Sequence, residues 1–230
     1  MQGTDVRIPS GARATPAYAA IPPGARRGVV VIHEIYGRAP DIDRVVERFA
    51  DAGYAAAAPD LFADGATAAC VARVLLASAT GSGRPVEQAV ATRSWLCEQA
   101  AIGEDKVGII GFCMGGGFVL GIGRGWGAVS ANYGTIPTQE RLRGIGPTIA
   151  CYGGRDRAFA PLAPRLRKAL DQVGVDNEVH VFPTVGHSFL TDGDHPIASR
   201  LSAPLLRIAY DARVAEDAWS KIFAFFDRHL

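Results

Sequence analysis

Short apolar runs alternate with amphipathic segments along most of this 230-residue chain. Residues 28–33, Gly-Val-Val-Val-Ile-His, form a β-branched run bounded by turn residues, which is typical of a strand buried on both faces. Residues 42–52 then place Val45 and Phe49 on one face of a helix, and Gly53 follows where helices commonly end. Further strands are expected at 54–58, 107–111, 128–133, 148–152 and 178–182, and further helices at about 71–77, 85–101, 114–122, 163–173 and 211–229. This alternation predicts an α/β fold with a mostly parallel sheet, helices on both faces, and ligands at the carboxyl ends of the strands.

Two of these helices carry expectations about single side chains. Asp41 or Asp43 can cap the N-terminus of the helix at 42–52, because a carboxylate oxygen accepts hydrogen bonds from free backbone N–H groups there. In the helix at 85–101, we expect Val90 and Leu96 among the side chains that face the core.

Composition indicates an ordinary globular protein, and we expect one domain over residues 1–230. Lys and Arg total 24 and Asp and Glu total 23, and neither sign forms a run, so nucleic acid is not an expected partner. The longest uncharged stretch, 107–123, contains seven glycines and is too short to span a membrane. The N-terminus lacks the pattern of a secretory signal, so we expect a cytoplasmic protein without a membrane partner.

The cysteines and histidines do not form a metal-binding pattern. The four cysteines include no CxxC pair, and we expect reduced thiols. No two histidines have the spacing of zinc ligands, and Gly37 stands where an HExxH motif beginning at His33 would need its second histidine. We therefore expect no metal.

Residues 111–115, Gly-Phe-Cys-Met-Gly, have the form G-x-nucleophile-x-G between an expected strand and an expected helix. In a nucleophile elbow, the glycines permit a sharp turn that leaves the central side chain, here Cys113, exposed at a helix N-terminus. A thiolate is favoured there by the helix dipole. A phosphate-binding loop fits poorly, because a Rossmann motif needs glycine at 113 and a P-loop needs lysine at 117. A buried structural cysteine remains an alternative for Cys113, and it is the favoured interpretation of Cys70 and Cys97, with Cys151 intermediate.

An acid and a base follow Cys113 in the order found in α/β-hydrolases. Asp156 lies in a turn after the strand at 148–152, and His187 lies in a turn after the strand at 178–182. A turn-forming aspartate and a solvated histidine are the alternatives, and the common order is what favours catalytic roles. Among the other histidines, His180 is expected on a strand face, and His195 and His229 at the surface.

Glu34 directly follows the expected strand at 28–33. In α/β-hydrolases the loop at this point supplies one N–H group of the oxyanion hole, and the residue after the nucleophile supplies the other. We assign these donors to Ile35 and Met114. The Glu34 carboxylate can either hold a nearby thiol protonated or accept its proton, and a surface glutamate is the alternative.

Five motifs in this order resemble the dienelactone hydrolases, also called carboxymethylenebutenolidases. They are His-Glu-Ile-Tyr-Gly at 33–37, Ala-Pro-Asp-Leu-Phe at 58–62, Gly-Phe-Cys-Met-Gly-Gly at 111–116, Gly-Gly-Arg-Asp at 153–156 and Gly-His-Ser-Phe at 186–189. The resemblance covers most of the chain and implies an α/β-hydrolase fold without a cofactor. It also implies a triad of Cys113, His187 and Asp156, with Glu34 in contact with the resting thiol and helping to deprotonate it when substrate binds.

The chain departs from this family where the substrate carboxylate would be held. Family members that act on dienelactone use two arginines there, whereas residues 63–65 and 190–192 of this chain read Ala-Asp-Gly and Leu-Thr-Asp. Asp64 and Asp192 would repel an anion, so we expect neutral esters or lactones as substrates. Arg38, Arg155 and Arg157 are the residues that could restore an anion site.

The leading hypothesis is a hydrolase of small esters or lactones that forms a thioester at Cys113. The expected substrate-binding residues are Tyr36, Phe112, Tyr133, Ser188 and Phe189, which adjoin the motifs and would line a mainly apolar pocket. The alternative is a protein of the same fold that uses Cys113 as a redox-sensing or ligand-binding thiol without turnover. A small-molecule substrate is the expected partner, and the protein is expected to be a monomer or a small homo-oligomer.

Overall fold

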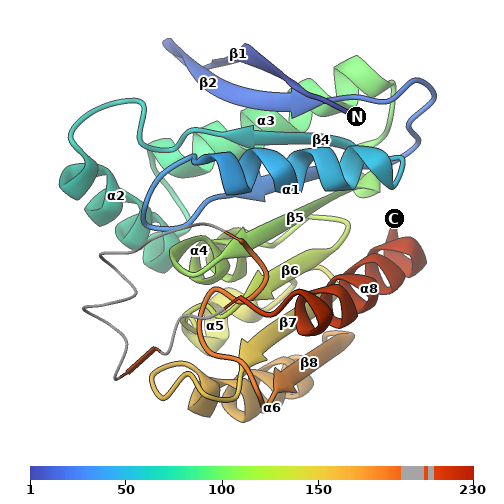
Figure 1. Cartoon of the computed structure of the whole chain (residues 1–230). Helices are drawn as coiled ribbons and strands as arrows, with labels where there is room; N and C mark the ends of the chain where they lie inside the picture. The colour runs from blue at the N-terminus through green and yellow to red at the C-terminus, as the bar shows by residue number, and fades with distance from the viewer. Residues whose placement is uncertain (193–204, 207–209) are drawn as a thin grey trace.

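The computed structural model describes residues 1–192, 205–206 and 210–230, and these residues contain an eight-stranded sheet (Figure 1). The strands are β1 Thr4–Ser10, β2 Arg13–Ala20, β3 Gly28–Ile32, β4 Ala55–Pro59, β5 Val107–Phe112, β6 Val129–Asn132, β7 Thr148–Gly153 and β8 Asn177–Phe182. Their order across the sheet is β1-β2-β4-β3-β5-β6-β7-β8. The pairs β1–β2 and β2–β4 are antiparallel, and the remaining neighbours are parallel. The six parallel strands therefore end at a common edge.

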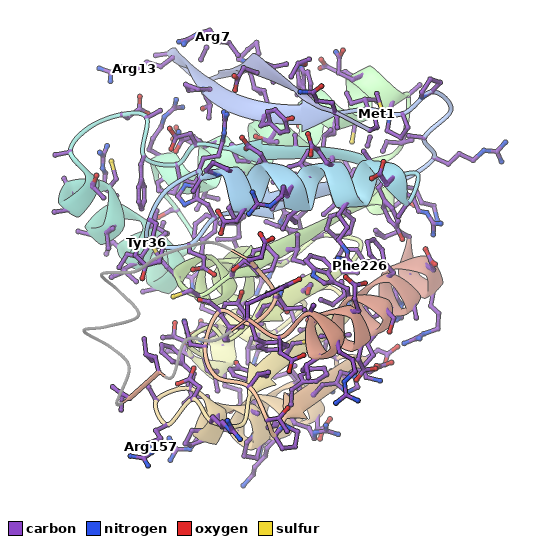
Figure 2. All side chains as sticks on the ribbon, viewed as in Figure 1. Met1, Arg7, Arg13, Tyr36, Arg157 and Phe226 are labelled. Atoms are coloured by element: carbon purple, nitrogen blue, oxygen red, sulfur yellow. The ribbon has the colours of Figure 1, made fainter. Side chains whose placement is uncertain are left out.

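Helices cover both faces of the sheet. They are α1 Pro40–Asp51, α2 Thr67–Thr80, α3 Arg84–Ala100, α4 Met114–Ile122, α5 Gln139–Leu142, α6 Ala163–Gln172 and α8 Ala212–His229, with short 3-10 helices at Glu104–Lys106 and Ala160–Leu162. Helices α1 and α8 lie together in front of the sheet in Figure 1, where Phe49 contacts Trp219 and Phe226 with ring centroids 5.8 and 6.0 Å apart. Phe226, labelled in Figure 2, is fully buried, and its ring lies 3.1 Å from where a Cβ on Gly108 of β5 would be. Among the described residues, no helix is long and apolar enough to cross a membrane.

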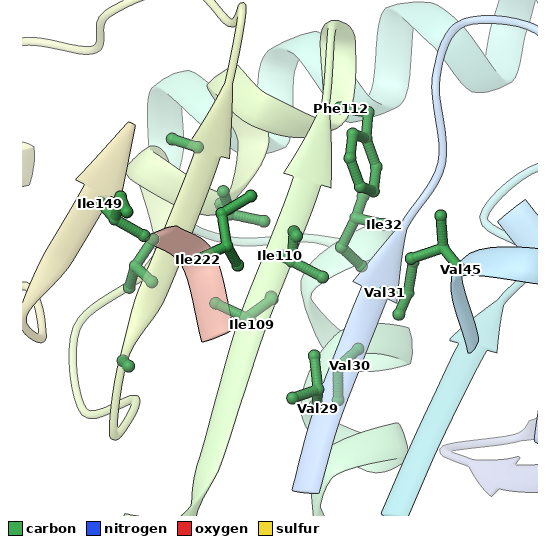
Figure 3. Close-up of a cluster of buried hydrophobic side chains, with 14 of the residues drawn as sticks. Val29, Val30, Val31, Ile32, Val45, Ile109, Ile110, Phe112, Ile149 and Ile222 are labelled. Atoms are coloured by element: carbon green, nitrogen blue, oxygen red, sulfur yellow. The ribbon is translucent and has the colours of Figure 1, made fainter. Parts of the chain in front are cut away.

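Strands β3 and β5 form the centre of the core. Every residue of both strands is buried, as their unbroken apolar sequences predict. Val29, Ile32 and Ile110 belong to the buried cluster drawn in Figure 3, and burial of each such side chain contributes roughly 1.5–3 kcal/mol. The register pairs Ile32 with Gly111, so β3 and β5 end side by side. The residues that follow these two strands are thereby brought to the same edge.

The structure confirms the parallel strands and the long helices to within a few residues at their ends. It corrects the expected helix cap, because Ala39 is the N-cap of α1 and no side chain caps it. The expectation that Val90 faces the core is also wrong, because this side chain is 36% exposed. Helix α3 instead buries Gln88, Thr92 and Leu96, whose spacing of four residues aligns them along one face.

Candidate active site

Cys113 lies in a sharp turn between β5 and α4 and has a backbone φ of 52° and ψ of −113°. A positive φ is uncommon for a residue other than glycine and stores roughly 1–3 kcal/mol of strain. The neighbouring glycines make the turn possible: a Cβ atom on Gly115 would lie 2.7 Å from the carbonyl oxygens of Ile32 and His33. Helix α4 therefore begins directly against the end of β3, and the Cys113 thiol lies at the carboxyl edge of the sheet.

The other three cysteines lack such surroundings. Cys70 and Cys151 are buried, and Cys97 is half-buried within α3. Burial raises the pKa of the Cys97 and Cys151 thiols, which disfavours their thiolates. Cys113 is half-buried and in this respect differs from the buried structural cysteine that is the alternative.

His187 and Asp156 form a buried pair, with Nδ1 of His187 2.6 Å from Oδ2 of Asp156. The other carboxylate oxygen, Oδ1, accepts hydrogen bonds from the backbone N–H groups of Ala158 and Phe159 at 3.0 and 3.1 Å. The turns after β7 and β8 are themselves joined, because the Gly154 N–H donates to the Phe182 carbonyl at 2.7 Å. The carboxylate is therefore fixed on the Nδ1 side of the imidazole.

The surroundings of His187 favour its protonated form. Burial alone would lower its pKa, but the hydrogen bond with Asp156 and the neighbouring Cys113 sulfur raise the pKa to about 10. Nε2 is buried and forms no hydrogen bond within the described part of the chain. The hydrogen bond between a nucleophile and its base is commonly long in a resting enzyme and shortens when substrate binds. This arrangement suits proton transfer from the Cys113 thiol to Nε2.

Glu34 is buried, with 2% of its surface exposed, so the interpretation as a surface glutamate is wrong. Three hydroxyl groups donate to its carboxylate: Tyr133 and Thr191 to Oε1 at 3.2 and 3.3 Å, and Ser188 to Oε2 at 3.2 Å. Burial and the negative charges of Glu34 and Cys113 raise the pKa of Tyr133. Glu34 and Cys113 therefore share one electrostatic environment.

The predicted substrate-binding residues separate into two groups. Tyr36 is 42% exposed, and its pKa is raised by burial of part of the ring and by Glu34 and Cys113. Ser188 and Tyr133 are buried and reach the site through their hydroxyl groups. The prediction is wrong for Phe112 and Phe189, which are fully buried.

Strand alternation explains the error at Phe112. Successive side chains of a strand point to opposite faces, so Phe112 packs inside the molecule against Trp219 at 6.0 Å while the next residue emerges at the sheet edge. Phe189 packs against Phe182 at 5.1 Å. Neither phenyl ring lines an open pocket.

The two backbone donors assigned to the oxyanion hole occupy the expected loops. Ile35 follows Glu34 after β3 and is 41% exposed, and Met114 is the first residue of α4. The Ile35 N–H thus lies in the loop after β3, and the Met114 N–H lies at the start of α4, shortly after the adjacent strand β5.

The carboxylates expected to repel an anionic substrate are engaged elsewhere. Asp64 forms an ion pair with Arg84 at 2.8 Å, and this hydrogen bond lowers its pKa. Asp192 forms an ion pair with Arg44. The expectation of direct repulsion by these two aspartates is therefore wrong, because an arginine neutralises each of them.

The arginines that could restore an anion site also have defined positions. Arg38 forms ion pairs with Asp5 and Asp43 at 2.6 and 3.0 Å. Arg155 and Arg157 are exposed, and Figure 2 shows Arg157 directed into solvent, far from Tyr36.

The sequence places three other histidines on a strand face or at the surface. His180 lies on β8 and bonds Glu178 at 2.9 Å, while His229 is half-buried near Asp176, and His195 lies outside the described residues. Within the described ranges, no group of three His, Cys, Asp or Glu residues could hold a metal ion.

Thr191 is a site residue that the sequence did not identify. The sequence marks residues 190–192 only by the lack of an arginine, and a threonine gives no signal that it will reach a carboxylate 157 positions away. Phe159 was also missed, and its ring packs against the imidazole of His187 with centroids 4.8 Å apart.

Comparisons with known proteins show the family of the chain. The profile of the dienelactone hydrolase family matches residues 15–230. A carboxymethylenebutenolidase of Rhodococcus opacus is 24% identical over 236 residues, covering 90% of this chain and 83% of that protein.

Solved structures show the same fold. A dienelactone hydrolase-like promiscuous phosphotriesterase from metagenomic libraries has a TM-score of 0.80 and 24% identity, covering 99% of this chain and 98% of that one. Dienelactone hydrolase from Anabaena variabilis has a TM-score of 0.63 and 22% identity, covering 90% of this chain and 100% of that one. With the family profile matching from β2 to the C-terminus, this α/β-hydrolase chain belongs to the dienelactone hydrolase family.

Proposed function

We propose that the protein hydrolyses small neutral esters or lactones through a thioester at Cys113, with His187 and Asp156 completing the triad. Family membership makes the chain a carboxylic ester hydrolase. The observation that carries the finer proposal is the strained turn at Cys113 beside the buried His187–Asp156 pair. A nucleophile, a base and a residue that orients the base are the minimum for this chemistry.

In the proposed acylation step, the Cys113 thiolate attacks the carbonyl carbon of the ester while His187 holds the proton that left the thiol. A C–S bond forms and the carbonyl oxygen becomes an oxyanion, which the N–H groups of Ile35 and Met114 stabilise. Collapse of this intermediate breaks the ester C–O bond. The leaving oxygen takes the proton from Nε2 of His187, which leaves a thioester and a neutral imidazole.

Deacylation reverses these roles. His187 accepts a proton from a water molecule, which attacks the thioester carbon. The second tetrahedral intermediate breaks its C–S bond, the thiolate is regenerated, and a carboxylic acid leaves. Asp156 holds the imidazole in the correct tautomer through both steps.

Glu34 is proposed to assist the deprotonation of Cys113. Support comes from its burial and from Tyr36 and Tyr133, because Glu34 and Cys113 both raise the pKa of each phenol. Three hydroxyl groups donate hydrogen bonds to this carboxylate and hold it in place. A carboxylate held in one position can act as a general base toward a nearby thiol.

The preference for a neutral substrate follows from the partners of the nearby arginines. Arg38, Arg44 and Arg84 are each held by at least one aspartate. A substrate carboxylate that bound any of these three arginines would have to displace its ion pair to gain a charge-assisted hydrogen bond. All four cysteines are free, which agrees with a reducing compartment, and we propose the cytoplasm.

The test is a set of p-nitrophenyl esters of increasing acyl length, assayed before and after alkylation with iodoacetamide. Turnover should be lost in proportion to the alkylation of Cys113, measured by mass spectrometry of peptides. A stoichiometric acyl adduct on Cys113 should be trapped by acid quenching. Alkylation of Cys113 without any ester turnover would instead indicate a redox-sensing or ligand-binding thiol and would overturn the proposal.

A further inference from the structure

His33 is a buried imidazole that the proposed mechanism does not use. It directly follows β3, and its Nδ1 lies 2.7 Å from the carbonyl oxygen of Glu34. On the other side of the ring, the Leu61 N–H donates to Nε2 at 3.1 Å. A carbonyl oxygen can only accept and a backbone N–H can only donate, so the ring is the neutral tautomer with its hydrogen on Nδ1.

The surroundings of His33 keep this ring neutral and in place. Burial lowers its pKa, and this effect exceeds the opposite influence of the Glu34 carbonyl, Asp60 and Asp41. The Phe62 ring and the imidazole pack in a T-shaped arrangement with centroids 4.7 Å apart. His33 therefore joins the loop after β3 to the loop after β4 through two hydrogen bonds of fixed direction.

The hydrogen bond to Glu34 has a consequence for the next residue. The Glu34 carbonyl and the Ile35 N–H belong to one peptide group, and the described chain contains no cis peptide bond. The N–H of a trans peptide points opposite its carbonyl. The backbone carbonyl oxygen of Glu34 also accepts a hydrogen bond from the Gly37 N–H at 3.1 Å. The His33 ring and the Gly37 N–H together fix the plane of this peptide group. Bonds to the carbonyl also strengthen the N–H as a donor, by an estimated 10–30% per bond.

We infer that His33 is a positioning residue that aims the Ile35 N–H at the oxyanion formed on substrates of Cys113. The inference rests on the proposed function, in which Ile35 is one of the two oxyanion donors. The elbow lies close to the same backbone, because a Cβ on Gly115 would meet the carbonyl oxygen of His33. His33 thus sets the direction of the donor without touching the substrate.

Two substitutions separate the two hydrogen bonds of the ring. In His33→Asn, the amide nitrogen replaces Nδ1 and can still donate to Glu34, but the acceptor for Leu61 is lost. In His33→Gln, the amide oxygen replaces Nε2 and can still accept from Leu61, but the donor to Glu34 is lost. Each variant loses one buried hydrogen bond, so the two serve as matched controls for stability.

The readout is the ratio of two rates measured on the same thiol. Acylation by a p-nitrophenyl ester develops an oxyanion, whereas alkylation by iodoacetamide displaces iodide from a CH₂ group and develops none. Loss of one oxyanion donor costs about 10²–10³ in rate, so a donor aimed incorrectly should cost about tenfold or more. We expect acylation to fall by about that factor in His33→Gln, with alkylation nearly unchanged, and the ratio in His33→Asn to stay within about threefold of wild type.

Equal loss of acylation and alkylation in His33→Gln would mean that His33 only supports the fold, and the inference would be overturned. So would a larger loss of the ratio in His33→Asn than in His33→Gln. If neither variant folds, ¹⁵N NMR of the wild-type imidazole ring decides. The range from about pH 6 to 8 surrounds the ordinary imidazole pKa, and a hydrogen that stays on Nδ1 throughout this range supports the inference. A hydrogen on Nε2, or titration in that range, overturns it. Failure of the proposed function is distinguished beforehand, because it would appear as absent or Cys113-independent turnover of the wild-type protein.

Discussion

Cys113 keeps its strained backbone because hydrogen bonds hold it on both sides. Its N–H donates to the Asn132 carbonyl at 3.0 Å, and its carbonyl accepts from the Gly117 N–H at 3.2 Å. These bonds belong to the backbone and do not depend on the side chain at position 113. The turn should therefore persist when the thiol is removed.

Replacement of Cys113 by alanine should abolish ester turnover while the protein stays folded. The new side chain is smaller, adopts the same backbone angles and leaves no large cavity, so the thermal unfolding temperature should change by only a few degrees. Cys113→Ser should be a poor enzyme, because the hydroxyl is much less acidic than the thiol. Cys97→Ala is the control and should retain kcat, and substantial kcat in Cys113→Ala would exclude Cys113 as the nucleophile.

Replacement of Glu34 by glutamine tests its proposed role as a proton acceptor. Glutamine keeps the size and can still bond the surrounding hydroxyl groups, but it cannot take up a proton. Acylation should slow by about 10²–10⁴, the usual contribution of a general base. Thr191→Val, which removes one hydrogen bond to Glu34, is the control and should reduce the rate far less. An unchanged burst rate in Glu34→Gln would leave His187 as the sole base.

At the scale of single residues, the sequence predicted those whose position follows from local motifs. Cys113, Asp156 and His187 each follow a recognisable strand, so their common edge could be derived from strand order. The contact between Thr191 and Glu34 could not, because it depends on how two loops distant in sequence fold over each other. Phe112 was misplaced because proximity to Cys113 along a strand does not mean exposure on the same side.

At the scale of elements, the buried strands were predictable and the N-terminal pair was not. Strands β3 and β5 are continuous apolar runs, whereas β1 contains Pro9 among polar and charged residues, and β2 contains Pro16 and a single β-branched residue. Proline cannot donate to a strand ladder and is confined mainly to edge strands and strand ends. Strand β1 is an edge strand, and Pro16 precedes Ala17–Ala20, the part of β2 that pairs with β4. Pairing with β4 across the sheet, which no local pattern encodes, makes β2 a strand.

The contact between α4 and the end of β3 can be tested at Gly115. In Gly115→Ala, the new Cβ would press on the carbonyl oxygens of Ile32 and His33, so α4 should shift. We expect a loss of about 1–3 kcal/mol in unfolding free energy and a fall of kcat by more than about tenfold. Gly53→Ala is the control: its φ of 86° should cost about 1–2 kcal/mol, but open space surrounds it and kcat should not change. Normal kcat in Gly115→Ala would show that the elbow tolerates this shift.

At the scale of the whole molecule, the distribution of ion pairs should decide which substrates are accepted. We expect a lactone presented as its methyl ester to have a kcat/KM about tenfold or more above that of its free acid, because an anion would lack a charge-assisted hydrogen bond of about 1.5–3 kcal/mol. Parallel assays of the two forms check this. Faster turnover of the acid, lost when Arg38, Arg155 or Arg157 is replaced by alanine, would contradict it.

His187 follows β8, the last strand of the described residues and an edge of the sheet, and this position affects how the protein is made. During synthesis on the ribosome, Cys113 emerges before Asp156, and Asp156 before His187. A nascent chain that ends before β8 has paired with β7 carries the thiol without its base. The growing polypeptide therefore acquires the complete proposed triad only after β8 has joined the sheet.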